Sequence, residues 1–303
     1  MSDQADGLRQ LFSMRSGPTA LADPPPTARG APPKTRSIVF TSGKGGVGTS
    51  NLVLNLAIAL GELGQRVVLV DADLGLANID LLCGLTPAGD LGDVLAGDGS
   101  LADAIVAGPG DIQIIPGAHG MRTLLEALDD APARLAAELA ELESEADFLL
   151  VDAGSGLGPG IATLAAAADQ VAIVTTPEPT SVADAHAAIN RLRRLPNPPV
   201  LRAVVNQAAS AAEASDVLAR LTASSRQFHG TVVTALGHVR SDPHVPMAVR
   251  MRRPFVVAYP GANASRCVRR LAHALIEERQ PRSRRPGFFA SLAARWALSR
   301  LAR

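Results

Sequence analysis

Lysine is almost missing from this sequence. Only Lys34 and Lys44 are lysines among its 29 basic residues, and the rest are arginines. Lys44 nevertheless lies inside the glycine-rich segment Gly43–Ser50. In a chain that so nearly excludes lysine, this placement indicates that a lysine is needed there.

Other features that are scarce exclude whole classes of protein. The two cysteines, Cys83 and Cys267, have no metal or redox spacing, and we interpret them as buried apolar residues in a reducing cytosol. The formal net charge is zero, so the whole chain has no attraction to nucleic acid. No run approaches the roughly 18 apolar residues that a spanning helix needs, and the acidic start around Asp3 and Asp6 does not resemble a signal peptide. We therefore expect a cytoplasmic protein.

The charge is unevenly distributed, however. Residues 279–303 contain seven arginines and no acid, which predicts a basic tail at 280–303 on an acidic body. A helix is expected over Pro286–Arg303 after a Pro/Arg hinge. Four of its apolar side chains share an arc of about 100° on a helical wheel, although Leu298 and Leu301 fall outside that arc. This pattern favours reversible binding to an anionic membrane surface over a solvated flexible end. These candidate membrane residues are Phe288, Phe289, Leu292 and Trp296.

Four regions follow from the composition along the chain. Residues 1–14 contain a short helical pattern, and residues 15–36 are rich in proline, glycine and alanine, as in a disordered linker. A folded domain is expected over 37–279, followed by the tail.

Short continuous apolar runs alternate with helical stretches in this domain. Such runs are typical of strands covered by helices on both faces. The sequence therefore predicts an α/β fold with a doubly wound, mostly parallel sheet flanked by helices. The strands are expected at Ile38–Thr41, Val67–Val70, Ile112–Ile115, Phe148–Val151, Val171–Thr175, Val200–Val205 and Val232–Leu236, with a helix at Ser50–Leu63.

The strand at Ile38–Thr41 leads into the glycine segment Gly43–Ser50, which a helix follows. Glycines allow backbone N–H groups to close around phosphate oxygens, and the helix N-terminus adds its positive end. Ser50 is placed to bind Mg²⁺. The usual pattern is G-x-x-x-x-G-K-[ST], and here Thr49 occupies the lysine position.

A different class of protein also fits these glycines. Gly43, Gly45 and Gly48 satisfy G-x-G-x-x-G, and Asp71 ends the next strand, where an acid would bind ribose in a dinucleotide-binding oxidoreductase. Lys44 counts against that alternative, because a dinucleotide loop needs no cation. Asp152, at the end of another buried strand, favours Mg²⁺ on a triphosphate.

Several segments together resemble the MinD/ParA family of P-loop ATPases. The loop with Lys44 is similar to that family's deviant phosphate loop, and Asp71–Asp80 and Asp152–Gly156 are similar to its two switches. Thr175–Ser181 and the later Arg253–Pro260 narrow the resemblance to the flagellar-number regulators of the FlhG/FleN type. The N-terminal Asp3–Arg9 resembles their D-Q-A-x-x-L-R element.

The resemblance implies a homodimeric ATPase switch that binds ATP and Mg²⁺. Lys44 would reach across to the partner's phosphates, and Asp73 would orient the attacking water. The N-terminal element would contact a signal-recognition-type flagellar GTPase, and the paired form would sit on the inner face of the cell membrane. By this resemblance, the nucleotide residues are Gly43, Gly45, Gly46, Val47, Gly48, Thr49, Ser50 and Asn206, the metal residues are Ser50, Asp71 and Asp152, and the partner residues are Gln4, Leu8 and Arg9.

Thr49 departs from the family pattern. The missing lysine would neutralise the β- and γ-phosphates, and removing one partner of a buried charge pair costs roughly 2–5 kcal/mol. Two functions therefore remain open, an ATPase switch and a non-hydrolysing scaffold with the same fold. A nucleic-acid partner is not expected, because the body is acidic and the aromatic residues of the tail suit lipid better.

Overall fold

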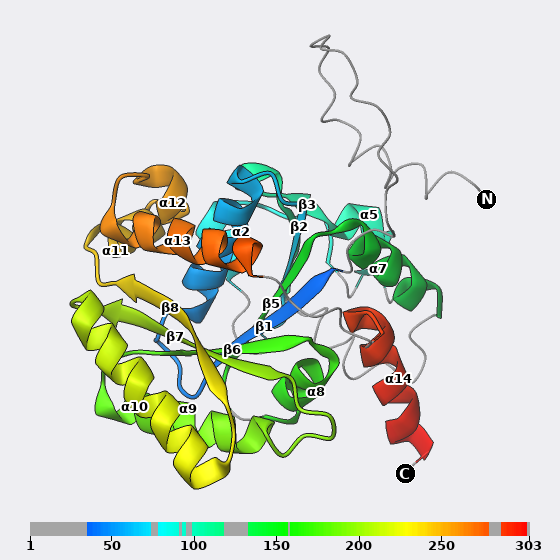
Figure 1. Cartoon of the computed structure of the whole chain (residues 1–303). Helices are drawn as coiled ribbons and strands as arrows, with labels where there is room; N and C mark the ends of the chain where they lie inside the picture. Colours follow the sequence, from blue (N-terminus) through cyan, green and yellow to red (C-terminus); the bar gives the residue numbers. More distant parts are fainter. Residues whose placement is uncertain are drawn as a thin grey trace, which may run out of the picture.

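A computed structural model gives the arrangement of the chain (Figure 1). It describes residues 35–73, 78–90, 93–94, 99–117, 133–156, 158–278 and 286–301. The predictions for residues 1–34, including the N-terminal helix and its Gln4, Leu8 and Arg9, concern residues outside these ranges.

An eight-stranded sheet forms the centre of the molecule, with the strand order β3-β4-β2-β5-β1-β6-β7-β8. All neighbouring strands are parallel except β3 and β4, which run antiparallel. The prediction of a mostly parallel sheet is confirmed, and all seven expected strands are present. The bounds are β1 Arg36–Ser42, β2 Val67–Asp71, β3 Val106–Ala107, β4 Gln113–Ile115, β5 Phe148–Ser155, β6 Gln170–Thr175, β7 Val200–Ala208 and β8 Val233–Arg240.

Helices cover both faces of this sheet, and each face has its own apolar core. Side chains along β1 alternate between the two cores, with Val39 in one and Ile38 and Phe40 in the other. One core includes residues of α5 Leu101–Ala104, α7 Ala133–Glu145, α8 Pro159–Ala167, α9 Pro179–Leu192, α10 Ala211–His229 and α14 Phe288–Leu301. The other includes residues of α2 Thr49–Glu62, α3 Ile79–Cys83, α11 His244–Arg250, α12 Phe255–Ala258 and α13 Asn263–Glu277.

The folded body begins slightly earlier than the sequence predicts. Thr35 and Arg36 were assigned to the linker, but Thr35 is buried and its hydroxyl donates to the carbonyl oxygens of Glu143 and Ala146 in and after α7. Arg36 is the first residue of β1. The linker assignment is therefore wrong for these two residues, because buried hydrogen bonds hold them to the body.

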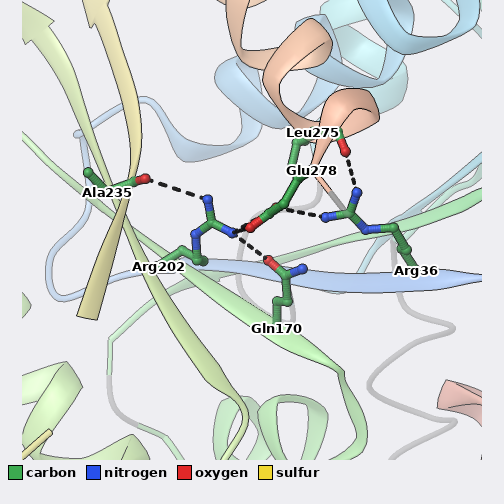
Figure 2. Close-up of polar contacts among 6 residues, drawn as sticks. All are labelled: Arg36, Gln170, Arg202, Ala235, Leu275 and Glu278. Atoms are coloured by element: carbon green, nitrogen blue, oxygen red, sulfur yellow. Dashed lines mark hydrogen bonds and ion pairs between the residues drawn. The ribbon is translucent and has the colours of Figure 1, made fainter. Parts of the chain in front are cut away.

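A shared ion cluster joins the end of α13 to the sheet (Figure 2). The carboxylate of Glu278 accepts from Arg36 at 3.0 Å and from Arg202 of β7 at 2.7 Å. Arg36 also donates to the carbonyl oxygen of Leu275, and Arg202 lies 3.4 Å from the side-chain oxygen of Gln170. Burial lowers the pKa of Arg36, and its hydrogen bond to Glu278 opposes that shift. One carboxylate thus fixes the C-terminal end of α13 against two strands.

The C-terminal helix α14 packs against the body. Phe288, Phe289 and Leu292 are only 2%, 4% and 1% exposed and belong to the same core as α7 and α8. The buried carboxylate of Glu143 accepts the backbone N–H groups of Phe288 at 2.6 Å and of Phe289 at 3.0 Å. In this state α14 is therefore not a separate tail, because the body covers the three side chains that the sequence predicts to bind lipid. Their membrane role stays a prediction. The side chain of Trp296 lies outside the described residues.

Within the described part of the chain, no helix is both long and apolar enough to cross a membrane.

Candidate functional site

The glycine loop connects β1 to α2 and lies at the carboxyl end of the parallel strands. Gly46 and Gly48 adopt left-handed backbone conformations, with φ of 83° and 84°, which glycine tolerates and other residues rarely adopt. At Gly43 a Cβ would lie 2.3 Å from a backbone carbon of Asp184, so α9 packs directly on the loop. The loop therefore requires glycine for both its turn and its packing.

Thr49 stands at the start of α2, where the lysine of the usual phosphate loop would be. It is 6% exposed, and its hydroxyl oxygen has no hydrogen-bond partner among the described residues. A neutral hydroxyl in this position donates no charge to a phosphate. Thr49 consequently leaves the loop without the cation that its motif predicts.

Two buried acids lie side by side behind the loop, because Asp71 of β2 and Asp152 of β5 are paired in register. Burial raises the pKa of Asp71 to about 7, and the neighbouring Asp152 adds to the effect. Burial likewise raises the pKa of Asp152 to about 6, partly opposed by a hydrogen bond from Ser50. Each carboxylate is therefore costly to keep ionised until a cation binds nearby.

The two acids differ in what their oxygens bind. One oxygen of Asp71 accepts from the backbone N–H of Asp73, and the other accepts from those of Asn78 and Ile79 at the start of α3. This arrangement closes the loop that resembles the first switch. Both oxygens of Asp71 thus already accept backbone N–H groups, so this acid holds the switch backbone rather than pointing unpartnered at a ribose.

Asp152 instead keeps one oxygen available. Its Oδ1 accepts from the backbone N–H of Gly154, whereas its buried Oδ2 has no hydrogen-bond partner among the described residues. Carboxylate and hydroxyl oxygens are the ligands that Mg²⁺ prefers. The adjacent Ser50 and Asp152 therefore fit a magnesium ion on a bound phosphate, and that ion would neutralise developing charge on the phosphates.

Asp73 lies over the segment that follows β5. A Cβ added to Gly154 would come within 2.5 Å of the Asp73 carboxylate carbon, and Gly154 has a left-handed φ of 67°. The two predicted switches therefore touch at this glycine, with Asp73 close to Asp152. This position is compatible with a role for Asp73 at a water beside the phosphates.

Lys44 has a partner within its own chain. Its Nζ lies 2.5 Å from the carboxylate of Glu178 and 3.1 Å from the hydroxyl of Thr180. The Thr175–Ser181 segment, which carries part of the family resemblance, therefore also binds Lys44, a contact that the sequence did not predict. The signal was indirect, since 134 positions separate Lys44 from Glu178.

Asn206 contacts the loop itself. Its side-chain N–H donates to the carbonyl oxygen of Val47 at 2.8 Å, and the adjacent Gln207 lies 3.5 Å from that of Gly46. Beyond them is a cavity of about 690 Å³ that runs from Gly48 to the loop after β8, including Arg240 and Asp242. Its size and its position next to the phosphate loop suit the nucleoside part of a nucleotide.

The comparisons with known proteins agree with this geometry. A family described as "AAA domain" matches residues 35–200. The antiactivator FleN of Pseudomonas aeruginosa is 38% identical over 228 residues, which cover 75% of this chain and 81% of that protein. Among solved structures, the Pyrococcus horikoshii septum site-determining protein MinD complexed with Mg-ADP has a TM-score of 0.64 at 28% identity, covering 80% of this chain and 96% of that one.

A second solved structure is the MinC:MinD cell division protein complex of Aquifex aeolicus. It matches with a TM-score of 0.62 at 26% identity, covering 83% of this chain and 100% of that chain. Together with the glycine loop, Lys44 and the paired acids, these matches show that the chain belongs to the MinD/ParA family of P-loop ATPases, close to the flagellar-number regulators of the FleN/FlhG type.

Proposed function

We propose that this protein is a nucleotide-gated, dimerising switch that regulates flagellar number and placement. The observation that carries the proposal is the orphaned Oδ2 of Asp152, which is buried beside Ser50 at the end of a glycine loop built for phosphates. Burying a carboxylate oxygen without a hydrogen-bond partner costs free energy unless a cation binds to it. Magnesium on ATP supplies that cation, as the Mg-ADP in the related MinD structure suggests.

Dimerisation would change the partner of Lys44. In the single chain this side chain is held by Glu178 and Thr180 on an exposed surface. An exposed ion pair of this kind contributes about 0–1 kcal/mol, so a partner's phosphates compete readily for the lysine. Lys44 then supplies to the facing subunit the positive charge that Thr49 does not supply within its own loop.

Membrane association would require α14 to leave the body. Phe288, Phe289 and Leu292 face the core beside α7 and α8 and can meet lipid only after that helix undocks. The tail arginines add attraction to anionic lipid of about 1 kcal/mol each, and pairing of two tails in a dimer strengthens a weak contact. Binding is therefore expected to be reversible, salt-sensitive and stronger in the dimer.

The N-terminal element would act on a signal-recognition-type GTPase through Leu8 as an apolar anchor and Arg9 as a charged contact. The double variant Leu8→Ala/Arg9→Ala should abolish stimulation of that GTPase and leave nucleotide binding by this protein intact. Equal stimulation by the double variant and the parent chain would refute this assignment.

A nucleotide titration with a parallel phosphate-release assay tests the central proposal. Asp152→Asn should weaken binding of ATP in the presence of Mg²⁺ and have little effect without it. Asp73→Asn should spare binding and, where there is turnover, trap the dimer. Asp216→Asn on α10 is the matched control and should change neither measurement. If Asp73→Asn alone abolished binding while Asp152→Asn did not, the proposed roles would be wrong.

A second candidate is a scaffold that binds nucleotide without hydrolysing it. The observation in its favour is Thr49, whose buried hydroxyl makes no hydrogen bond within the described part of the chain. Phosphate release at the rate of background hydrolysis, together with nucleotide-dependent pairing, would support the scaffold over the cycling switch.

A further inference from the structure

The segment from Met247 to Arg253 is unusually exposed for a structured part of the body. It contains the end of α11 and the turn that follows, and every residue in it except Ala248 is exposed. Met247 is 46% exposed and Met251 is 50% exposed, which is high for apolar side chains next to a core. We name Met247, Val249, Arg250, Met251, Arg252 and Arg253 the methionine–arginine face. It lies at the corner of the molecule formed by α11 and α12 (Figure 1).

This face is also strongly cationic. From Pro243 to Ile276 the sequence holds six arginines and no acid. Among the described residues only Arg269 of these six forms an ion pair, with Glu62 of α2. The guanidinium groups of Arg250, Arg252 and Arg253 consequently have no carboxylate partner in the described part of the molecule. Their positive charge is therefore not neutralised by a paired acid there.

The fold holds the face in place. The backbone N–H of Val256 in α12 donates to the buried Asn55 side chain in α2, the helix that follows the phosphate loop. The backbone N–H of Arg253 donates to Ala248, which closes the turn. The turn passes through Arg252 in a left-handed conformation, with φ of 51°. The exposed side chains therefore project from an ordered segment rather than from a loose loop.

We propose that the methionine–arginine face docks an acidic protein segment that presents aliphatic side chains among its carboxylates. Methionine and arginine are enriched in the cores of protein interfaces, whereas lysine, glutamate and aspartate are depleted there. Methionine adapts its shape to an apolar partner. The positive charge of the exposed arginines favours a docking segment that carries negative charge.

Two other anionic partners fit the face less well. A single-stranded nucleic acid needs exposed aromatic rings for stacking, and this face has none among its six residues. A lipid surface needs a continuous apolar side, typically with tryptophan, phenylalanine or leucine, but here arginines interrupt the apolar positions. The face also adjoins the nucleoside cavity, since Val249 and Arg250 line both, so a docked segment would lie next to a bound nucleotide.

The test uses the full-length chain and a fluorescent probe peptide of about five helical turns, or about 18 residues, with glutamates flanking a stripe of leucines. Arg252→Glu/Arg253→Glu should weaken its binding by at least about tenfold, which corresponds to about 1.4 kcal/mol. Met247→Ser/Met251→Ser should weaken binding by roughly threefold, because the apolar contact is lost. Arg191→Glu/Arg194→Glu, which reverses two exposed arginines near the end of α9, is the matched control and should bind like the parent chain.

Several outcomes would overturn the proposal. One is the absence of measurable peptide binding, and another is an equal loss of binding in the α9 control, which would show that only net charge matters. A peptide with the same glutamates but serine in place of leucine should bind more weakly. Equal binding of the two peptides would refute an apolar contribution of this face to docking. Tighter binding of single-stranded DNA or of phosphatidylserine vesicles, lost in the same Arg252/Arg253 variant, would assign the face to those partners instead. Thermal unfolding and nucleotide binding of each variant verify that it is folded.

Discussion

At the scale of single residues, this phosphate site differs from the usual phosphate loop in its charge. The loop has glycines where its backbone must turn and a serine where a metal would bind, but Thr49 is neutral. Lys44 is charged, yet it is engaged by Glu178. On the proposed function, the phosphates of a nucleotide bound to a single chain would meet backbone N–H groups and Mg²⁺ but no lysine. We therefore expect weak binding by a single chain that is strongly coupled to pairing.

Restoring the lysine at position 49 measures directly how much the missing positive charge weakens nucleotide binding and hydrolysis. We expect Thr49→Lys to tighten ATP binding and to raise phosphate release at least about tenfold, the equivalent of about 1.4 kcal/mol. Thr49→Val is the matched control, because it changes the same buried side chain without adding a charge and should therefore raise neither value. If parent turnover already equalled that of Thr49→Lys, another group would have taken over the charge, and the scaffold would be ruled out.

The buried acid pair predicts how stability depends on pH. The pKa of Asp71 is raised to about 7 in the folded protein, so between its unfolded value near 4 and 7 the folded state binds more protons. Its contribution is therefore fully present below about pH 4 and is lost as the pH rises through about 7. Urea unfolding of the nucleotide-free protein measures this effect. The difference in unfolding free energy between Asp71→Asn and the parent chain should shift in favour of the variant as the pH rises from 5 to about 8. A pH-independent difference between the two proteins would contradict this account.

At the scale of elements, α14 shows that the sequence of a C-terminal helix does not reveal which surface the helix binds. A helical wheel identifies its apolar side but cannot tell whether lipid or protein covers that side. In the structure, the apolar side of α14 packs against α7 and α8, and Glu143 caps the N-terminus of the helix. The same difficulty applies to Lys44, whose partner Glu178 is far away in sequence.

The cap provides a specific test of docking. Glu143→Gln replaces a carboxylate that accepts two backbone N–H groups with a neutral amide, which weakens the helix end by about 1–2 kcal/mol. Sedimentation with anionic vesicles should then increase several-fold, because α14 is released more often. Glu141→Gln, an exposed acid on the same helix, should not change sedimentation. Removal of residues 280–303 should abolish it, and unchanged vesicle binding after that deletion would refute a membrane role for the tail.

At the scale of the whole molecule, most of the architecture could be predicted from the sequence. The central strands contain short apolar runs such as Phe148–Val151, whose residues are all buried, as expected for strands that helices cover on both faces. Strand β3, Val106–Ala107, was not predicted, because two residues give no pattern and its pairing with β4 depends on the tertiary fold. The acid-free stretch from Pro243 to Ile276 was visible in the sequence, but its exposure was not, because Phe255 and Val256 beside it are buried.

The cluster around Glu278 should support the whole body. Glu278→Gln would leave the guanidinium groups of Arg36 and Arg202 without their shared carboxylate. Breaking a fully buried pair costs roughly 3–5 kcal/mol, and because Glu278 is about one third exposed we expect a smaller loss, about 2–3 kcal/mol. Chemical denaturation measures this loss. Glu277→Gln is the neighbouring control and should leave the free energy of unfolding nearly unchanged.

The same cluster determines how the molecule would respond to a mechanical load. Arg36 opens the first strand of the folded body, and Glu278 follows its last helix before the segment that leads to α14. Their side chains meet at 3.0 Å (Figure 2), so the two points where the chain enters and leaves this body are tied together. Tension between those points would be borne by this ion pair and by the hydrogen bond from Arg36 to Leu275, at the edge of the sheet away from the phosphate loop. A pull on the tail would first load the packing of α14 against the body, and the ion cluster would hold the ends of β1 and α13 together behind it.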